Sequence, residues 1–147
     1  MKRVKDILRN KGDQVWAVSP NVTVRDALQE MADKNIGAVL VMDQGHLAGI
    51  FSERDYARKL DLQGRRADET LVEEVMTRQV VGVRPDDSVD ECMAIMTQRR
   101  IRHLPVVDGG EVAGIVSIGD VVKSIISEQQ FLIEQLELYI TGTPQRR

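Results

Sequence analysis

The feature that most limits how this chain can fold is an internal duplication. When the sequence is aligned with itself at a shift of 65 residues, Pro20 meets Pro85, and residues 48–50 meet the identical residues 113–115. The match needs no gap from residue 15 to residue 60 of the first copy. Since only two copies are present, and the period exceeds that of common solenoids, we expect a closed pair related by a two-fold axis rather than an open array.

Each copy has the pattern of a β-α-β-β-α unit. The first helix of each copy has Thr23 or Ser88 at its N-cap, ahead of apolar residues spaced i, i+3, i+4, i+7. The turns Gln44–Gly45 and Gly109–Gly110 are typical of two-residue hairpins, and a last helix is expected after each hairpin. The expected strands are 15–18, 38–42 and 46–51 in the first copy and 80–83, 103–107 and 111–116 in the second.

Two such units predict a mixed α+β fold with pseudo-two-fold symmetry. Short helices are expected ahead of the copies, at residues 4–9 and 71–76, and a polar stretch at 63–70 links the two halves. We expect three parts, a first repeat at 1–65, a second repeat at 66–127 and a C-terminal helical extension with a tail at 128–147.

The C-terminal extension has no counterpart in the first copy. The last helix is expected to continue from Ser127 to Ile140, where Gly142 and Pro144 end it. An apolar stripe on such a helix packs either on a partner or on the flank of its own chain, and we favour a homodimer. The stripe consists of Phe131, Leu132, Leu136 and Ile140.

Composition excludes several classes of function. The net charge is −3, from 20 Lys and Arg against 23 Asp and Glu, which gives no basic excess for nucleic acid. The longest apolar stretch, residues 36–42, is too short to span a bilayer, and the charged N-terminal segment lacks an apolar secretion signal, so a cytoplasmic protein without membrane contact is expected. One cysteine and two histidines are too few for a zinc site, and no catalytic triad or Walker loop is found, so we expect no enzyme.

The most informative segment is residues 49–55, repeated at 114–120. A strand ends there, a serine stands at the helix start, and an aspartate follows three residues later. That spacing resembles a capping box, which satisfies free N–H groups of the helix. The same geometry can bind a nucleotide, because helix N–H groups attract phosphate and a carboxylate can hold a ribose diol. The two roles are compatible, and Gly49 and Gly114 are expected to let a flat base approach the backbone.

The repeat resembles the CBS domain, a family named after cystathionine β-synthase, and two repeats in tandem resemble a Bateman module. The resemblance covers about residues 1–127. It rests on the Gly-x-x-Ser-x-x-Asp segment in both copies, on Arg-His-Leu-Pro-Val at residues 102–106, and on the β-α-β-β-α order. It implies two copies packed sheet to sheet, with two equivalent clefts that commonly hold adenosine compounds.

Carried over by position, the resemblance implies that Asp55 and Asp120 hold ribose hydroxyls, while Ser52 and Ser117 contact phosphate or ribose. The starts of the strands would meet adenine through backbone groups. Arg54, together with the arginine and histidine at 102–103, would neutralise phosphate. The expected binding residues are Val15, Trp16, Ala17, Gly37, Ala38, Ser52, Arg54, Asp55, Val80, Val81, Arg102, His103, Pro105, Ser117, Gly119 and Asp120.

These residues predict a regulatory module that senses energy or redox state by binding an adenine nucleotide. AMP or NAD(H) is favoured over ATP, ADP or S-adenosylmethionine, and an unidentified regulated protein is a further expected partner. The alternative is a scaffold protein with no physiological nucleotide. The halves differ, because Arg54 aligns with Gly119 and residues 37–38 align with 102–103, so the two sites are expected to differ in affinity or ligand.

Four residues have competing interpretations. Cys92 lies on an apolar stripe and is expected to be a buried small side chain rather than a redox thiol. His46 is expected at the surface beside a turn. Trp16 is either a core residue or a stacking platform, and His103 is either a packed strand residue or a phosphate ligand.

Overall fold

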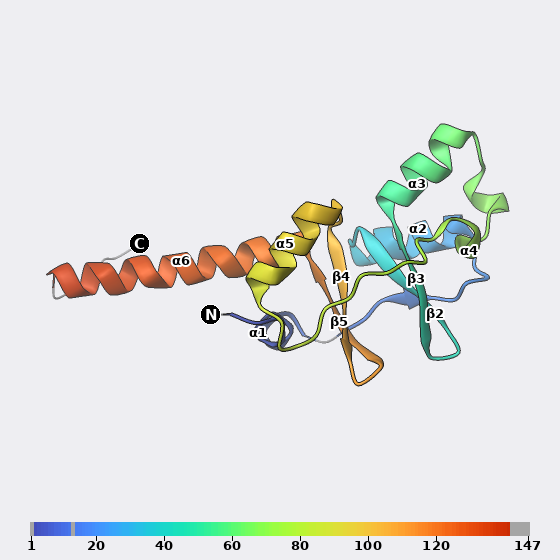
Figure 1. Cartoon of the computed structure of the whole chain (residues 1–147). Helices are drawn as coiled ribbons and strands as arrows, with labels where there is room; N and C mark the ends of the chain where they lie inside the picture. Colours follow the sequence, from blue (N-terminus) through green and yellow to red (C-terminus); the bar gives the residue numbers. More distant parts are fainter. Residues whose placement is uncertain (1, 13, 142–147) are drawn as a thin grey trace.

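The computed structural model describes residues 2–12 and 14–141, and it contains two separate β-sheets with helices around them (Figure 1). The first sheet has the order β1-β2-β3, with a parallel β1–β2 pair and an antiparallel β2–β3 pair. The second is the antiparallel hairpin β4-β5. The mixed α+β fold is therefore confirmed. The strands are β1 (Ala17–Val18), β2 (Ala38–Asp43), β3 (His46–Ser52), β4 (His103–Asp108) and β5 (Glu111–Ser117).

Local sequence signals place most helices where they were expected. The Thr23 hydroxyl accepts the N–H of Asp26 at 3.1 Å, and the Ser88 hydroxyl accepts the N–H of Glu91 at 3.0 Å, so both predicted N-caps are confirmed. The helices are α1 (Val4–Lys11), α2 (Val24–Lys34), α3 (Glu53–Lys59), α4 (Val72–Val75), α5 (Val89–Arg99) and α6 (Ile118–Thr141), with 3₁₀ turns η1 (Asp61–Gln63) and η2 (Ala67–Glu69).

The two hairpin turns also form as predicted. Gln44 and Gly45 have φ of 50° and 81°, and Gly109 and Gly110 have φ of 60° and 85°. Positive φ at both central residues gives the turn a twist that matches the flanking strands.

The strand expected at residues 80–83 is wrong, because only a single parallel bridge forms there, between Val83 and Val106. In the first repeat, the Leu40 N–H donates to the Trp16 carbonyl at 3.2 Å. The equivalent of Leu40 is Pro105, which has no N–H to donate. The proline thus shortens the ladder, and residues 80–81 are left free of the sheet.

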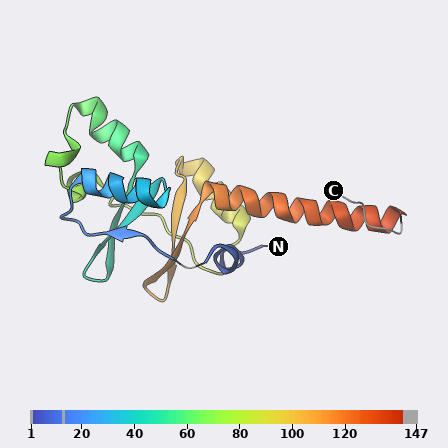
Figure 2. The same cartoon turned by 180° about the vertical axis from the view of Figure 1, so that it is seen from behind.

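The two cores exchange the helices that precede them in the sequence. Val4 and Ile7 of α1 are buried in the core of the second repeat, and Val72 and Val75 of α4 are buried in the core of the first. Isolated bridges anchor the exchange at Arg3–Ser88 and Thr23–Leu71. Helix α1 lies beside β5 in Figure 1, and also in Figure 2, which shows the chain from behind.

Gly49 and Gly114 serve this exchange, and the expectation that they admit a flat base is wrong. A Cβ on Gly49 would stand 2.7 Å from both the Met76 sulfur and the Thr77 carbonyl oxygen. A Cβ on Gly114 would stand 2.6 Å from a Leu8 methyl carbon. Each glycine is therefore covered by the helix segment that comes from the other half of the chain.

Helix α6 begins in the second repeat, where Val121 is fully buried, and then projects away from the body (Figures 1 and 2). Its 24 residues span about 36 Å. The alternative that this helix covers its own flank is wrong for the described residues. The stripe is exposed, at 60% for Phe131, 55% for Leu132, 60% for Leu136 and 77% for Ile140.

The sequence also predicts where the last helix ends and that no segment spans a membrane. The predicted stop at Gly142 and Pro144 lies outside the described residues. Within residues 2–12 and 14–141, no helix is long and apolar enough to cross a membrane.

Candidate functional site

A cavity of about 710 Å³ lies between the two repeats, beside the start of α3. Three segments that are distant in sequence meet around it: the β3–α3 junction, the chain that follows α4, and the turn from α5 into β4. Its lining consists of Gly37, Ile50, Ser52, Glu53, Arg54, Asp55, Thr77, Gln79, Val80, Val81, Arg99, Arg100, Ile101, Arg102 and His103.

The Ser52–Asp55 pair forms the capping box that the spacing predicts. The Ser52 hydroxyl accepts the Asp55 N–H at 3.2 Å, and the Asp55 carboxylate accepts the Ser52 N–H at 2.9 Å. The N–H of Glu53 donates to the Gly37 carbonyl at 3.1 Å, which ties the start of α3 to the segment before β2. Asp55 is only 7% exposed, so the carboxylate is fixed in the cavity wall.

Two further groups hold the Asp55 carboxylate from outside α3's first turn. The Thr77 hydroxyl donates to Asp55 Oδ1 at 3.2 Å, and the Lys59 ammonium lies 3.0 Å from the same oxygen. Lys59 also donates to the Val75 carbonyl at 2.9 Å and is not part of the cavity lining, so its charge lies on the α4 side. The cavity side of Asp55 thus meets hydroxyl groups, which can exchange partners with a ligand.

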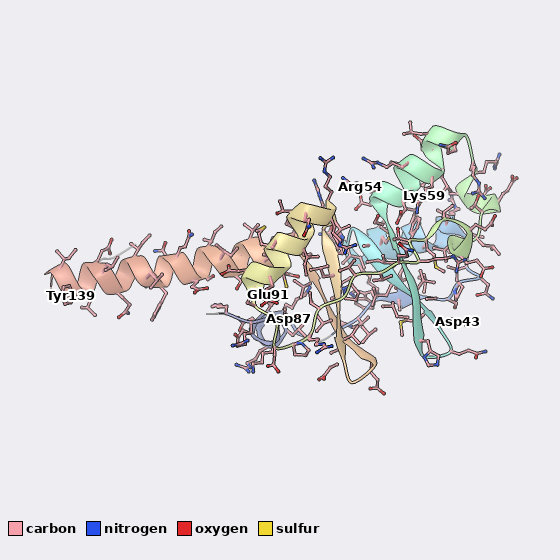
Figure 3. The ribbon with its side chains drawn as sticks, viewed as in Figure 1. Asp43, Arg54, Lys59, Asp87, Glu91 and Tyr139 are labelled. Carbon is pink, nitrogen blue, oxygen red and sulfur yellow. The ribbon has the colours of Figure 1, made fainter. Side chains whose placement is uncertain are left out.

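Arginines dominate the charge of the cavity. Arg54, Arg99, Arg100 and Arg102 face two carboxylates, Glu53 and Asp55, which leaves a formal charge of +2. Arg54 bridges the repeats, because its guanidinium donates to the Arg100 carbonyl at 2.5 Å. Figure 3 shows Arg54 on the end of α3 that faces the second repeat, with Lys59 further along the helix. A phosphate in this cavity would find several charge-assisted donors.

His103 lies at the junction of the two halves, with its ring close to Gly37. Burial lowers the pKa of His103, and the cations of Lys11 and Arg102 lower it further against the opposing effect of Asp120. The imidazole is therefore neutral at pH 7 and offers a hydrogen bond rather than a charge. The expected neutralisation of phosphate consequently rests on the arginines.

The second copy has the same capping box but different surroundings. The Asp120 carboxylate accepts the Ser117 N–H at 2.9 Å and the Lys11 ammonium at 2.7 Å. Burial raises the pKa of Asp120, but the Lys11 and Ser117 hydrogen bonds lower it more, so the pKa stands below its ordinary value. Asp120 lines a cavity of only about 120 Å³, which lies between α1 and α6.

The structure divides the sequence-predicted binding residues into two groups. The group that lines the large cavity is Gly37, Ser52, Arg54, Asp55, Val80, Val81, Arg102 and His103. The group outside its lining is Val15, Trp16, Ala17, Ala38, Pro105, Ser117, Gly119 and Asp120. In the second group, Pro105 is buried in β4, where its carbonyl accepts the Val83 N–H at 3.0 Å. Trp16 packs against the first core, and the Lys34 ammonium lies 4.4 Å from the centre of its ring.

Several lining residues were not predicted. The Arg99–Arg100 pair stands out in the sequence as a basic cluster, and that signal could have placed it here. Thr77 and Gln79 carry no such signal, because they reach the cavity only through the exchanged position of α4. Two further predictions from the sequence are confirmed, since the Cys92 side chain is fully buried and His46 is exposed at the surface.

The comparisons with known proteins agree with this architecture. The CBS domain family model matches residues 4–62 and 72–127. The CBS domain-containing protein CBSX3, mitochondrial, of Arabidopsis thaliana is 38% identical over 149 residues, covering 95% of this chain and 72% of that protein.

Solved structures of CBS-domain proteins superpose on most of the chain. A protein with CBS domains from Burkholderia ambifaria MC40-6 is 51% identical, with a TM-score of 0.84, over 87% of this chain and 96% of that one. The CBS domain pair of protein MJ0100, in complex with 5′-methylthioadenosine and S-adenosyl-L-methionine, is 28% identical, with a TM-score of 0.76, over 87% of this chain and 98% of that one. Because the family model matches two repeats that together cover most of the sequence, this chain belongs to the CBS domain family.

Proposed function

We propose that this protein is a non-catalytic regulatory module that binds an adenine nucleotide, with AMP or NAD(H) as the favoured ligand. The observation that carries the proposal is the 710 Å³ cavity, in which the Ser52–Asp55 capping box and four arginines meet. Its volume suits a small-molecule ligand. The adenosine compounds bound by the CBS pair of MJ0100 support the same chemical class.

Each part of the cavity suits one part of a nucleotide. Asp55 would accept the ribose hydroxyls, once the Thr77 and Ser52 hydroxyls turn toward the ligand. Arg54 and Arg102 would bind phosphate. The backbone of residues 80–81, which Pro105 leaves free of the sheet, would supply hydrogen bonds to adenine.

Calorimetric titration with AMP, NAD⁺ and adenosine tests the proposal. Asp55→Ala is expected to weaken AMP about thirty- to hundred-fold, since two ribose hydrogen bonds are worth about 2–3 kcal/mol. Asp43→Ala is the matched control, because Asp43 is exposed at the far end of β2 (Figure 3). Arg102→Ala is expected to weaken AMP and to leave adenosine nearly unchanged.

Wild-type protein that binds no member of this panel would favour the alternative, a scaffold without a nucleotide. A simple preliminary measurement is thermal stability, because a ligand at a hundred times its Kd adds about 2.7 kcal/mol. Equal loss of AMP and adenosine in Arg102→Ala would show that Arg102 has a structural role only.

We also propose that two copies of the chain associate through α6. The support is the exposed apolar stripe, which continues to Tyr139 at 88% exposure near the free end of the helix (Figure 3). A stripe this long on one helix is unusual for a monomer. Each of these side chains would contribute about 1.5–3 kcal/mol on burial, before the costs of association.

Light scattering tests the association. Wild type is expected to be a dimer at micromolar concentration, and Leu132→Glu with Leu136→Glu a monomer, whereas the control Gln135→Glu should remain dimeric. A monomeric wild type would refute the proposal. The cytoplasmic location and the unidentified regulated protein remain predictions.

A further inference from the structure

The two halves differ in the segment that lies beside the capping box, which is the end of α1 in one half and the chain after α4 in the other. The bridge residues Arg3 and Leu71 are 68 residues apart, although the repeats themselves are offset by 65. Helix α1 uses the extra residues to run one turn further than α4, to Lys11. The large cavity therefore has an extended segment at Thr77, whereas the second half has the last turn of α1 at the corresponding place.

Lys11 takes over both hydrogen-bonding roles of Thr77. Thr77 donates its N–H to the Ile50 carbonyl at 2.8 Å and its hydroxyl to Asp55. Ile115 is the equivalent of Ile50. The Lys11 ammonium donates to the Ile115 carbonyl at 3.0 Å and to the Asp120 carboxylate at 2.7 Å.

The exchange of a hydroxyl for an ammonium changes what the carboxylate can bind. A hydroxyl can both donate and accept, so Thr77 can turn toward a ribose, but an ammonium only donates. A short charge-assisted hydrogen bond is stronger than one made by a neutral sugar hydroxyl. The Lys11 and Asp120 side chains are only 33% and 21% exposed, so water screens this pair weakly.

The position of the Lys11 charge distinguishes it from Lys59, which also contacts an aspartate of this type. Lys59 lies on the far side of Asp55, where it binds the Val75 carbonyl. Lys11 instead binds the carbonyl of Ile115, and Ile50, the equivalent of Ile115, lines the large cavity of the first half. Asp55 lines the cavity of about 710 Å³ between the repeats, whereas the cavity of about 120 Å³ that Asp120 and Lys11 line lies between α1 and α6.

We infer that Lys11 is a built-in occupant of the second binding cleft, which holds Asp120 in place of a ribose and limits the chain to one adenine nucleotide. The inference rests on the proposed function for the nature of the ligand. It assigns the choice between one site and two to a single residue at the C-terminal end of α1.

Calorimetric titration with AMP measures the number of sites directly. Wild type is expected to bind one AMP per chain and Lys11→Met two, because methionine keeps the apolar stem of the side chain and removes the charge. Lys5→Met is the matched control on the same helix, since Lys5 pairs with the exposed Asp86, and it should bind one. The double variant Lys11→Met with Asp120→Ala should return to one.

The measured quantity is the difference between Lys11→Met and wild type, so it is separate from the test of the first cavity. A gain of one site supports the inference even if wild type binds none, an outcome that would refute the proposed function of the large cavity. Equal numbers of sites in the two proteins, whether none, one or two, would overturn it. Thermal melting checks folding, and Lys11→Gln replaces Lys11→Met if the latter melts well below Lys5→Met.

Discussion

Replacing Gly49 by alanine tests the packing of the exchanged segments most directly. The new Cβ would stand 2.7 Å from the Thr77 carbonyl oxygen and 2.7 Å from the Met76 sulfur. The carbonyl belongs to a backbone that exchanges two hydrogen bonds with Ile50, at 2.8 and 3.0 Å, so it can retreat only by stretching that bridge. Overpacking of this kind costs about 1–3 kcal/mol, and the weakened hydrogen bonds add about 1 kcal/mol.

Gly114→Ala provides the internal comparison, because Gly114 is the equivalent position in the second repeat. There the Cβ would meet the end of the Leu8 side chain, at 2.6 Å, rather than backbone. A leucine can adjust its rotamer, so the strain is smaller. Neither glycine has positive φ, and alanine therefore gains about 0.4–1 kcal/mol by restricting the unfolded chain. We expect a net loss of about 2–3 kcal/mol for Gly49→Ala and below about 1 kcal/mol for Gly114→Ala.

Urea denaturation followed by circular dichroism measures both variants. With a slope of about 2 kcal/mol/M, Gly49→Ala should lower the midpoint by about 1 M, and Gly114→Ala should change it little. Equal shifts in the two variants, or a larger shift in Gly114→Ala, would refute the argument that backbone and side-chain neighbours respond differently.

Two further predictions follow from buried or half-buried ionisable groups. Burial raises the pKa of Cys92 to about 11, so iodoacetamide at about pH 8 should label the protein in denaturant but not in its native state; native labelling would contradict the burial. The lowered pKa of Asp120 contributes stability that is present above the unfolded value of about 3.9 and is lost as pH falls through the folded pKa. Urea midpoints measured through the acid range should therefore fall more steeply for wild type than for Asp120→Asn, and parallel curves would rule out this contribution.

Most of the fold could be predicted because its signals are local. The N-caps at Thr23 and Ser88, the glycine turns and the capping boxes each depend on residues within a few positions of one another. The loss of the strand at 80–83 depends instead on residues that are distant in sequence, because Pro105 lacks an N–H at the position where Leu40 donates to Trp16.

The candidate site was harder to predict because it depends on tertiary contacts. No pattern in the sequence indicates that α4 packs into the core of the first repeat, and this contact brings Thr77 beside Asp55. Lys11 was overlooked for the same reason, since an alignment at 65 residues pairs it with the buried Met76 rather than with Thr77. Patterns of local spacing identify Ser52 and Asp55, but they do not reveal which neighbours complete the cavity.

The exchange of α1 and α4 has a consequence for synthesis on the ribosome. The first repeat cannot close its core when Leu60 emerges, because the core still lacks Val72, Val75 and Met76. Conversely, α1 is made first but has nowhere to pack until the second repeat follows, so its apolar face at Val4 and Ile7 stays unburied for most of translation. A chain cut between the repeats would leave two fragments that each carry the other's helix, and such fragments should fold only when both are present.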